Sequence, residues 1–223
     1  MNLKSMVNLI IIFTTLAVSS QENLYTSFSI PDNLRQNANA VIRLSSIDIE
    51  LKSSDNMLVT EKRIITVLNK EGDRNIDAYV GYDNTTKIKD LEARVFDNFG
   101  KEIKKIKKND FKDVSAVSGG TLYSDSRVKY LDYTPISYPY TIAYTSTLTS
   151  SNTAFIQSFM PLDNYYLSVE KSNYTISYPE HIIIRKKEKH LEDLNIEKVE
   201  GPGKLSYNAK NIEAIKPESY SPL

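Results

Sequence analysis

The sequence predicts an all-β protein, an antiparallel β-sandwich preceded by an N-terminal signal-peptide helix. Apolar and polar residues alternate with the two-residue period of a half-buried strand, as at Ile47, Ile49 and Leu51, and helical periodicity is almost absent. The chain of 223 residues has 15 tyrosines, which favour strands, and only 7 glycines. This length is sufficient for one large β domain with a single core. We therefore expect long, regular strands.

Residues 1–20 have the layout of a secretory signal peptide. Lys4 supplies the positive charge, residues 6–18 are mostly apolar, and small residues lead to a cleavage site after Ser20 or Ser19. The apolar run is shorter than the roughly 20 residues that a permanent membrane helix needs. The pattern predicts export to the periplasm or the exterior without a stable membrane span; an uncleaved anchor and a buried N-terminal segment are the alternatives.

The mature chain divides into a lead-in at residues 21–39, a β domain at residues 40–215 and an extended tail at residues 216–223, interpreted as a truncated continuation. A short helix is expected within residues 31–40, where Pro31 suits a first turn. The residues at 97–100 form a hairpin turn in which Gly100 supplies positive φ. Strand patterns occur at 41–51, 57–68, 76–82, 91–103, 127–133, 138–148, 165–179, 182–189 and 204–215.

Composition excludes several classes of function. Lys plus Arg and Asp plus Glu are equal at 28 each, so no net charge draws the chain to nucleic acid or anionic lipid. Cysteine is absent, which excludes disulfides, thiolate metal sites and a thiol nucleophile. The two histidines, His181 and His190, have no neighbours typical of a metal or catalytic motif. No cofactor and no catalytic residue are therefore predicted.

A set of tyrosine, aspartate and arginine residues is the candidate ligand or partner face. Tyrosine offers a flat apolar ring and a hydroxyl group, which suit a saccharide or a peptide. Cross-strand packing of the tyrosines on one sheet face is the favoured alternative. The set comprises Tyr123, Asp125, Arg127, Tyr130, Asp132, Tyr133, Tyr138 and Tyr140.

Three further hypotheses about local motifs have weaker support. Residues 124–126 with Asp132 could hold Ca²⁺, but their spacing matches no defined calcium loop. Asp125 and Asp132 would be the acid and base of an enzyme only if the fold brought them together in a cleft. The lysines at 101–108 could meet an anionic partner, but an edge strand protected from aggregation is the better interpretation.

From residue 40 onward the chain resembles a domain of unknown function that lies at the N-terminus of exported Bacteroidota proteins, ahead of a transglutaminase-like domain. The segments that carry this resemblance are 67–72, 96–105, 110–115, 125–133, 138–142, 165–170 and 214–218. The resemblance implies a β-sandwich without catalytic residues of its own. The transglutaminase-like domain and its cysteine are absent from this sequence.

The predicted function is that of an exported, non-catalytic module that docks or positions a protein partner or a downstream catalytic domain. The alternative is a module that binds carbohydrate or peptidoglycan fragments with its tyrosine-rich face. For that alternative, replacement of Tyr130 and Tyr138 by alanine should abolish glycan retention and leave the fold intact.

Overall fold

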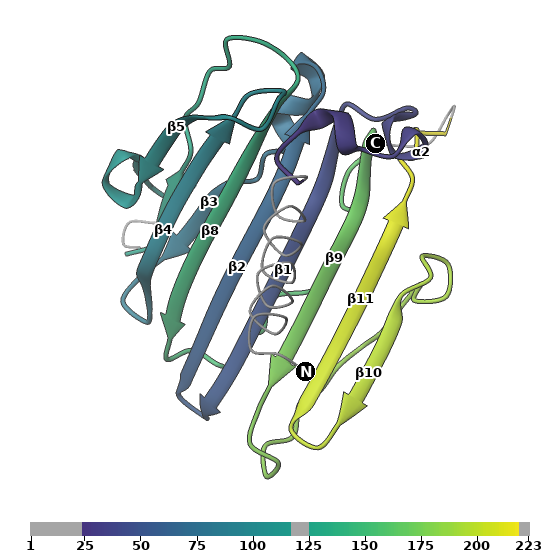
Figure 1. Ribbon diagram of the computed structural model, residues 1–223. Coiled ribbons are helices and arrows are strands. Elements are labelled where there is room, and N and C mark those ends of the chain that lie inside the picture. Colours follow the sequence, from purple (N-terminus) through teal and green to yellow (C-terminus); the bar gives the residue numbers. More distant parts are fainter. Residues whose placement is uncertain (1–23, 117–124, 219–223) are drawn as a thin grey trace, which may run out of the picture.

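The computed structural model describes residues 24–116 and 125–218 and is dominated by an eight-stranded sheet in the order β10-β11-β9-β1-β2-β8-β4-β5 (Figure 1). This confirms the all-β class. The predicted signal peptide and its cleavage after Ser20 lie outside the described residues. The strands of this sheet are β1 (Ala40–Ser53), β2 (Asn56–Val67), β4 (Thr86–Phe96), β5 (Glu102–Lys107), β8 (Tyr140–Ser150), β9 (Leu167–Ser177), β10 (Glu197–Gly201) and β11 (Lys204–Ile212).

The pairing in the large sheet is antiparallel except at its centre. β1 pairs with β2 as an antiparallel hairpin, but it pairs with β9 in parallel, from Ala40 opposite Leu167 to Glu50 opposite Ser177. A parallel pair needs a long crossover, because the chain must return to the same end of the sheet. Here β2 to β8 and their connections form that crossover, so strands distant in sequence lie side by side.

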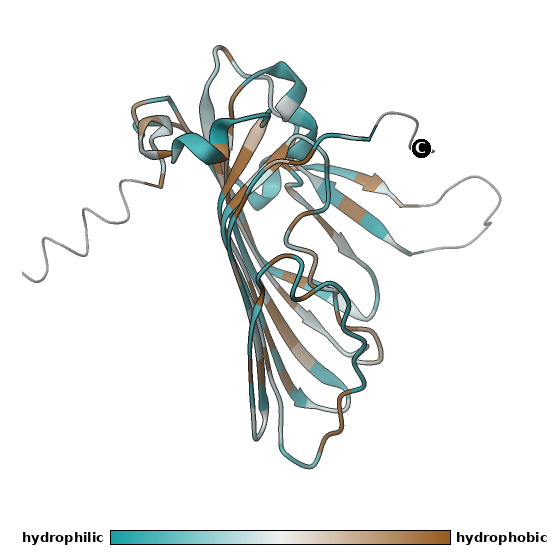
Figure 2. Cartoon of the chain, turned by 90° about the vertical axis from the view of Figure 1, so that its right-hand side faces the viewer, coloured by the Kyte–Doolittle hydropathy of each residue, from teal (hydrophilic) through white to brown (hydrophobic). Residues whose placement is uncertain are grey.

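A second layer covers one face of the large sheet, which we call the inner face (Figure 2). Part of this layer is a three-stranded sheet in the order β3-β7-β6. The rest consists of two irregular segments, residues 151–166 and 178–196, whose apolar side chains pack on the same face. The small strands are β3 (Tyr79–Tyr82), β6 (Lys112–Ser115) and β7 (Arg127–Tyr130).

The core lies between these two layers and follows from the strand periodicity. Ile65 faces Ile142 across β2 and β8, and Ile142 faces Val95 across β8 and β4, so the three side chains form one row on the inner face. All three are buried. Burial of an aliphatic side chain of this size contributes roughly 1.5–3 kcal/mol. The opposite, outer face carries the alternating polar residues, such as the exposed Asp48 and Glu50 of β1.

The N-terminal lead-in caps one end of the sheet. It contains the 3-10 helix η1 (Ser27–Ser29) and the short helix α2 (Asp32–Arg35), so the expected helix is present, with Pro31 at its N-cap. Ile30 and Leu34 pack against Val41 of β1 in a small separate cluster. The lead-in is therefore an integral part of the fold.

The structure agrees with two predictions from the sequence: the hairpin turn at residues 97–100 and the basic edge strand that follows it. Asp97 accepts hydrogen bonds from the backbone N–H groups of Phe99 and Lys101, and Gly100 has a φ of 85°. The sheet order places β5 at an edge, with most of its side chains exposed. Its lysines thus cover an unpaired strand edge.

Three local predictions differ from the structure. Residues 182–189 are extended but pair with no described strand, because this segment crosses the inner face with Ile182 and Ile184 directed to the core. β3 begins only at Tyr79, because the 3-10 helix η2 (Lys70–Asn75) occupies the preceding turn. β6 and β10 were not expected, since all of their residues are exposed. The remaining short helix is η3 (Lys108–Asp110).

Candidate functional site

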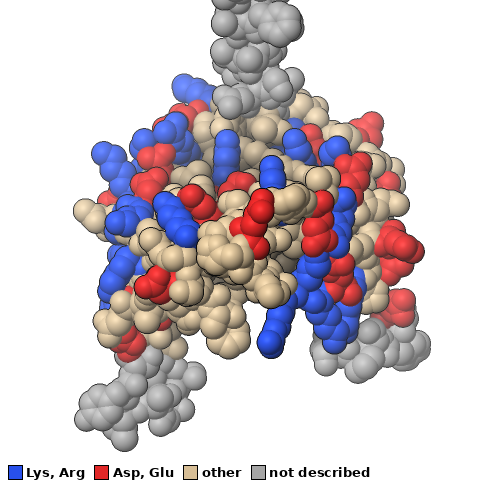
Figure 3. Space-filling view, turned by 90° about the horizontal axis from the view of Figure 1, so that it is seen from below, with Lys and Arg blue, Asp and Glu red and all other residues tan. Residues whose placement is uncertain are grey.

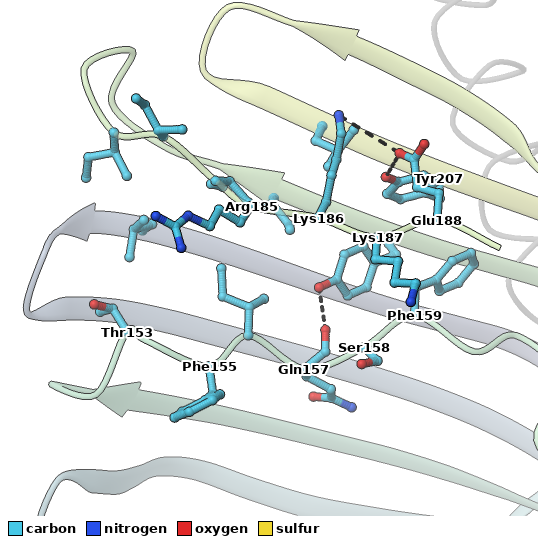
Figure 4. A pocket seen from close by; sticks show the side chains of 18 of the residues that line it. Thr153, Phe155, Gln157, Ser158, Phe159, Arg185, Lys186, Lys187, Glu188 and Tyr207 are labelled. Carbon is cyan, nitrogen blue, oxygen red and sulfur yellow. Dashed lines mark hydrogen bonds and ion pairs between the residues drawn. The ribbon is translucent and has the colours of Figure 1, made fainter.

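Two hollows lie between the inner face and the segments that cover it. The first, which we call the apolar groove, has a volume of about 660 Å³. Its floor is formed by Leu51 of β1, Ile176 of β9 and Leu205 of β11. Its walls are the extended segments 153–159 and 182–189 (Figure 4). Cavities of this size accept small molecules or short chain segments.

Hydrogen bonds attach both walls to the sheet. The Tyr174 hydroxyl donates to the carbonyl oxygen of Gln157, and the Tyr207 hydroxyl donates to Glu188 at 2.5 Å (Figure 4). Burial and the bond to Glu188 raise the pKa of Tyr207 above its ordinary value. Lys198 of β10 forms an ion pair of 2.9 Å with Glu188. The groove is therefore a preformed feature whose walls are anchored to β9, β10 and β11.

The rim of the apolar groove exposes large apolar groups. Phe155 is 84% exposed and Ile183 is 89% exposed, although each belongs to a wall whose neighbouring residues point inward. Exposed apolar groups beside a hollow are typical of an interaction surface.

Three cations of the second wall, Arg185, Lys187 and Lys189, have no ion-pair partner among the described residues. They give the groove a locally basic wall, while charges of both signs are interspersed over the surface seen from below (Figure 3). An unpaired cation at an apolar surface is available to an acidic group on a partner.

The second hollow, which we call the polar cavity, has a volume of about 430 Å³ and lies between β3 and residues 157–163. Phe159 lines both hollows and packs on Tyr174 and Tyr207, with ring centroids 5.4 and 5.9 Å away. The charged residues of the polar cavity are Glu61, Arg63, Asp77 and Asp163.

Arg63 is the most deeply buried of these charges, with an exposed fraction of 8%. Its Nη2 atom donates to the carbonyl oxygen of Asn75 at 3.2 Å and lies 3.6 Å from Oδ2 of Asp77. Its Nε atom has no hydrogen-bond partner among the described residues. Burial raises the pKa values of Glu61 and Asp77, and the Arg63 charge opposes this shift only in part.

The predicted tyrosine face separates into two groups with different partners. In the first, the hydroxyls of Tyr138 and Tyr140 donate to the two carboxylate oxygens of Asp73, each at 2.6 Å. Tyr133 packs on Tyr140, and Lys104 lies over the Tyr133 ring. The bond to Asp73 raises the pKa of Tyr138 to about 12. These hydroxyls are engaged within the protein.

The second group surrounds Asp113 of β6. Arg127 donates to Asp113 at 2.9 Å, and the Tyr82 hydroxyl donates to both of its carboxylate oxygens. These bonds, the one from Tyr82 foremost, lower the pKa of Asp113 to about 2. Tyr130 remains partly exposed opposite Tyr79 on β3.

The two candidate acids also have separate partners. Asp125 accepts a hydrogen bond from the backbone N–H of Asn84, whereas Asp132 lies 3.9 Å from Lys112. Tyr123 lies outside the described residues. None of the described residues of the predicted face lines either hollow.

Metal binding finds no geometric support in residues 24–116 and 125–218, which contain no group of three or more His, Asp or Glu side chains placed to hold an ion. His190 instead lies 2.8 Å from Asp193 at an exposed turn. No helix in the same described ranges is long and apolar enough to cross a membrane.

Sequence reasoning missed the polar cavity, although β2 contains a signal for it. Glu61 and Arg63 fall on the same face of the strand as Ile65 and Val67, which belong to the core. Charged residues at inward positions are unusual and mark a position where stability is sacrificed or a partner is needed.

The fold and the two hollows define the class of protein: a β domain with one large curved sheet (Figure 1), in which two hollows lie between the inner face and the layer that covers it. The chain belongs to the family described as a domain of unknown function with a solved structure, DUF3857, whose model matches residues 53–216. Comparison with curated proteins finds no match.

Solved structures show where this fold recurs. A protein from Parabacteroides distasonis, described as a candidate protease, is 14% identical with a TM-score of 0.58; the match covers 82% of this chain and 38% of that one. This chain therefore spans well under half of that protein, and the similarity shows the fold alone. A candidate nutrient-binding protein from Legionella pneumophila is 9% identical over 83% of this chain and 66% of that one, but its TM-score of 0.36 does not establish a shared fold.

Proposed function

We propose that this domain is an exported, non-catalytic module that docks a partner protein or positions a catalytic domain. The apolar groove is the observation that carries the proposal, because its rim exposes Phe155 and Ile183 above an apolar floor. Covering these two side chains would remove apolar surface from water, which is the main source of association free energy.

The groove suits an extended segment that carries both apolar and acidic residues. Its two walls are extended and pair with no described strand, so their main-chain groups can pair with an added segment. Arg185, Lys187 and Lys189 would meet the acidic residues of that segment. The occupant is therefore a protein segment.

The comparison with the Parabacteroides protein supports a role as one module among others, because the shared fold covers only 38% of that longer chain. A transglutaminase-like domain is the catalytic partner that the sequence resemblance implies. Export is part of the proposal and follows from the pattern of residues 1–20.

Site-specific photocrosslinking in cells tests this function. A photoreactive amino acid at position 155 should give one discrete protein adduct, whereas the same group at Asp48 on the outer face should not. In the complex with the protein so identified, Ile183→Asp should weaken binding about tenfold, because it places a charge in an apolar contact. Identical adducts at both positions, or unchanged affinity of the Ile183→Asp variant, would refute the docking role.

Glycan binding stays a prediction. Tyr130 of the predicted face lies opposite Tyr79 of β3, and the rings of this cross-strand pair are exposed. Tyr138 is bonded to Asp73, so its replacement would also disturb a contact within the protein.

A further inference from the structure

The polar cavity exists because small side chains lie beneath it. Ser172 of β9, Ser45 of β1 and Arg63 of β2 occupy neighbouring positions across the sheet. Ser45 and Ser172 are buried and line the cavity floor, and they leave open volume above the sheet. The Arg63 guanidinium therefore borders a hollow instead of packed side chains.

Arg63 is incompletely paired for a buried cation. A guanidinium has five N–H donors, and the single hydrogen bond shown for this one goes to a neutral carbonyl oxygen of Asn75. The nearest carboxylate oxygen, on Asp77, lies at 3.6 Å, beyond hydrogen-bonding distance. A buried charge left in this state is costly, and a carboxylate in the cavity would complete its coordination in a bidentate manner.

Three carboxylates surround the same hollow. Glu61 precedes Arg63 on the inner face of β2, Asp77 lies just before β3, and Asp163 lies on the segment opposite. Asp77 interacts electrostatically with both Asp163 and Glu61, so the three groups are close enough to act on one ligand. With one cation and three anions, the ionised cavity has a net charge of −2 and favours a ligand with two positive groups.

The unpaired edge of β3 contributes main-chain hydrogen-bonding groups to the polar cavity. The carbonyl oxygen of Ala78 accepts a hydrogen bond from the backbone N–H of Leu131, which follows β7. Hydrogen-bonded positions alternate along an antiparallel pair, so the main-chain groups of Val80 also point toward β7. The main-chain groups of Gly81 then point to the other side of β3, where no described strand pairs with it. Gly81 lines the cavity, and its lack of a side chain leaves this edge accessible.

We propose that the polar cavity binds a free diamino acid of the lysine type, with the ligand carboxylate on Arg63 and its two ammonium groups on Asp77, Asp163 and Glu61. A volume of about 430 Å³ is sufficient for such a ligand. This inference does not depend on the docking role, because it rests on residues that the apolar groove does not use.

Isothermal titration calorimetry of the full chain with three probes tests the proposal. L-lysine should give saturable binding. Cadaverine has both amines but no carboxylate, and Nα-acetyl-L-lysine methylamide represents a lysine within a peptide. Both should bind at least about tenfold more weakly, because they leave Arg63 unpaired. Absence of binding by L-lysine, or equal binding of cadaverine or of the blocked lysine, overturns the proposal.

Two variants and a matched control test whether L-lysine binds in the polar cavity. Asp163 is exposed, so Asp163→Asn should fold normally and weaken L-lysine binding about threefold, as expected for one exposed ion pair. Asp77→Asn, which is less exposed, should weaken it about tenfold. Asp132→Asn removes a carboxylate outside the cavity and should leave binding unchanged. Equal effects of Asp132→Asn and Asp163→Asn would show a general charge effect and contradict this site.

Discussion

Replacement of Gly72 by alanine should destabilise the protein by about 3 kcal/mol, the upper end of the range for an overpacked interior. A Cβ atom on Gly72 would lie 2.2 Å from the carbonyl oxygen of Asn39 and 2.8 Å from its carbonyl carbon. That carbonyl cannot move aside easily, because it accepts a hydrogen bond from Leu68, and the N–H of Asn39 donates to Tyr166. The glycine thus permits close contact between η2 and the start of β1.

Thermal unfolding measures this effect, and Gly201 provides the matched control. A Cβ atom on Gly201 would meet no atom within 4 Å, so Gly201→Ala should change stability by no more than about 0.5 kcal/mol. For a domain of this size the Gly72→Ala variant should melt roughly 6–12 °C below the wild type. Equal melting temperatures of the two variants would mean that the contact of η2 with Asn39 is not tight.

Replacement of Arg43 by leucine should cost about 3 kcal/mol, since it removes a buried guanidinium that pairs with the half-buried Glu170. Arg43 is 1% exposed and lies at a bulge where the register of β1 against β2 shifts. Its guanidinium bonds to Glu170 at 2.5 Å, and to the carbonyl oxygen of Thr26 and the hydroxyl of Ser29 at 2.8 Å. The variant leaves these acceptors without their cation.

Hydrogen exchange distinguishes this loss from a general weakening of the fold. Because Arg43 joins the lead-in to β1 and β9, the amides near residues 26–29 should lose protection first in the Arg43→Leu variant. Arg94→Leu is the control, since Arg94 is an exposed arginine paired with Glu92 and Glu102, and it should cost about 0–1 kcal/mol. A similar loss of stability in both variants would contradict the anchoring role of Arg43.

Local patterns in the sequence predicted much of the large sheet. β1, β2 and the hairpin of β4 and β5 follow from two-residue alternation and from Gly100, because these features depend on neighbours in the chain. The basic character of β5 also indicated its edge position. These features can be predicted without knowing which strands pair with each other.

Features that depend on distant contacts were not predicted. The parallel pairing of β1 with β9 has no local signature, because the same alternation suits either direction. Residues 182–189 alternate as a strand does, yet they meet the core from above the sheet and not from its edge. The apolar groove and the polar cavity arise from that second layer, so their lining residues could not be assembled from the sequence alone.

The parallel pair at the centre of the sheet also bears on how the chain folds. The ion pair of Arg43 with Glu170 joins residues 127 positions apart, so the two sides of the sheet centre meet only after most of the domain has emerged. Contacts of such long range carry a loop-closure entropy cost and slow folding. Until β9 arrives, the hairpin of β1 and β2 presents an open strand edge that can pair with other chains. A partly folded chain in which β9 has not yet paired with β1 is therefore expected to be prone to aggregation.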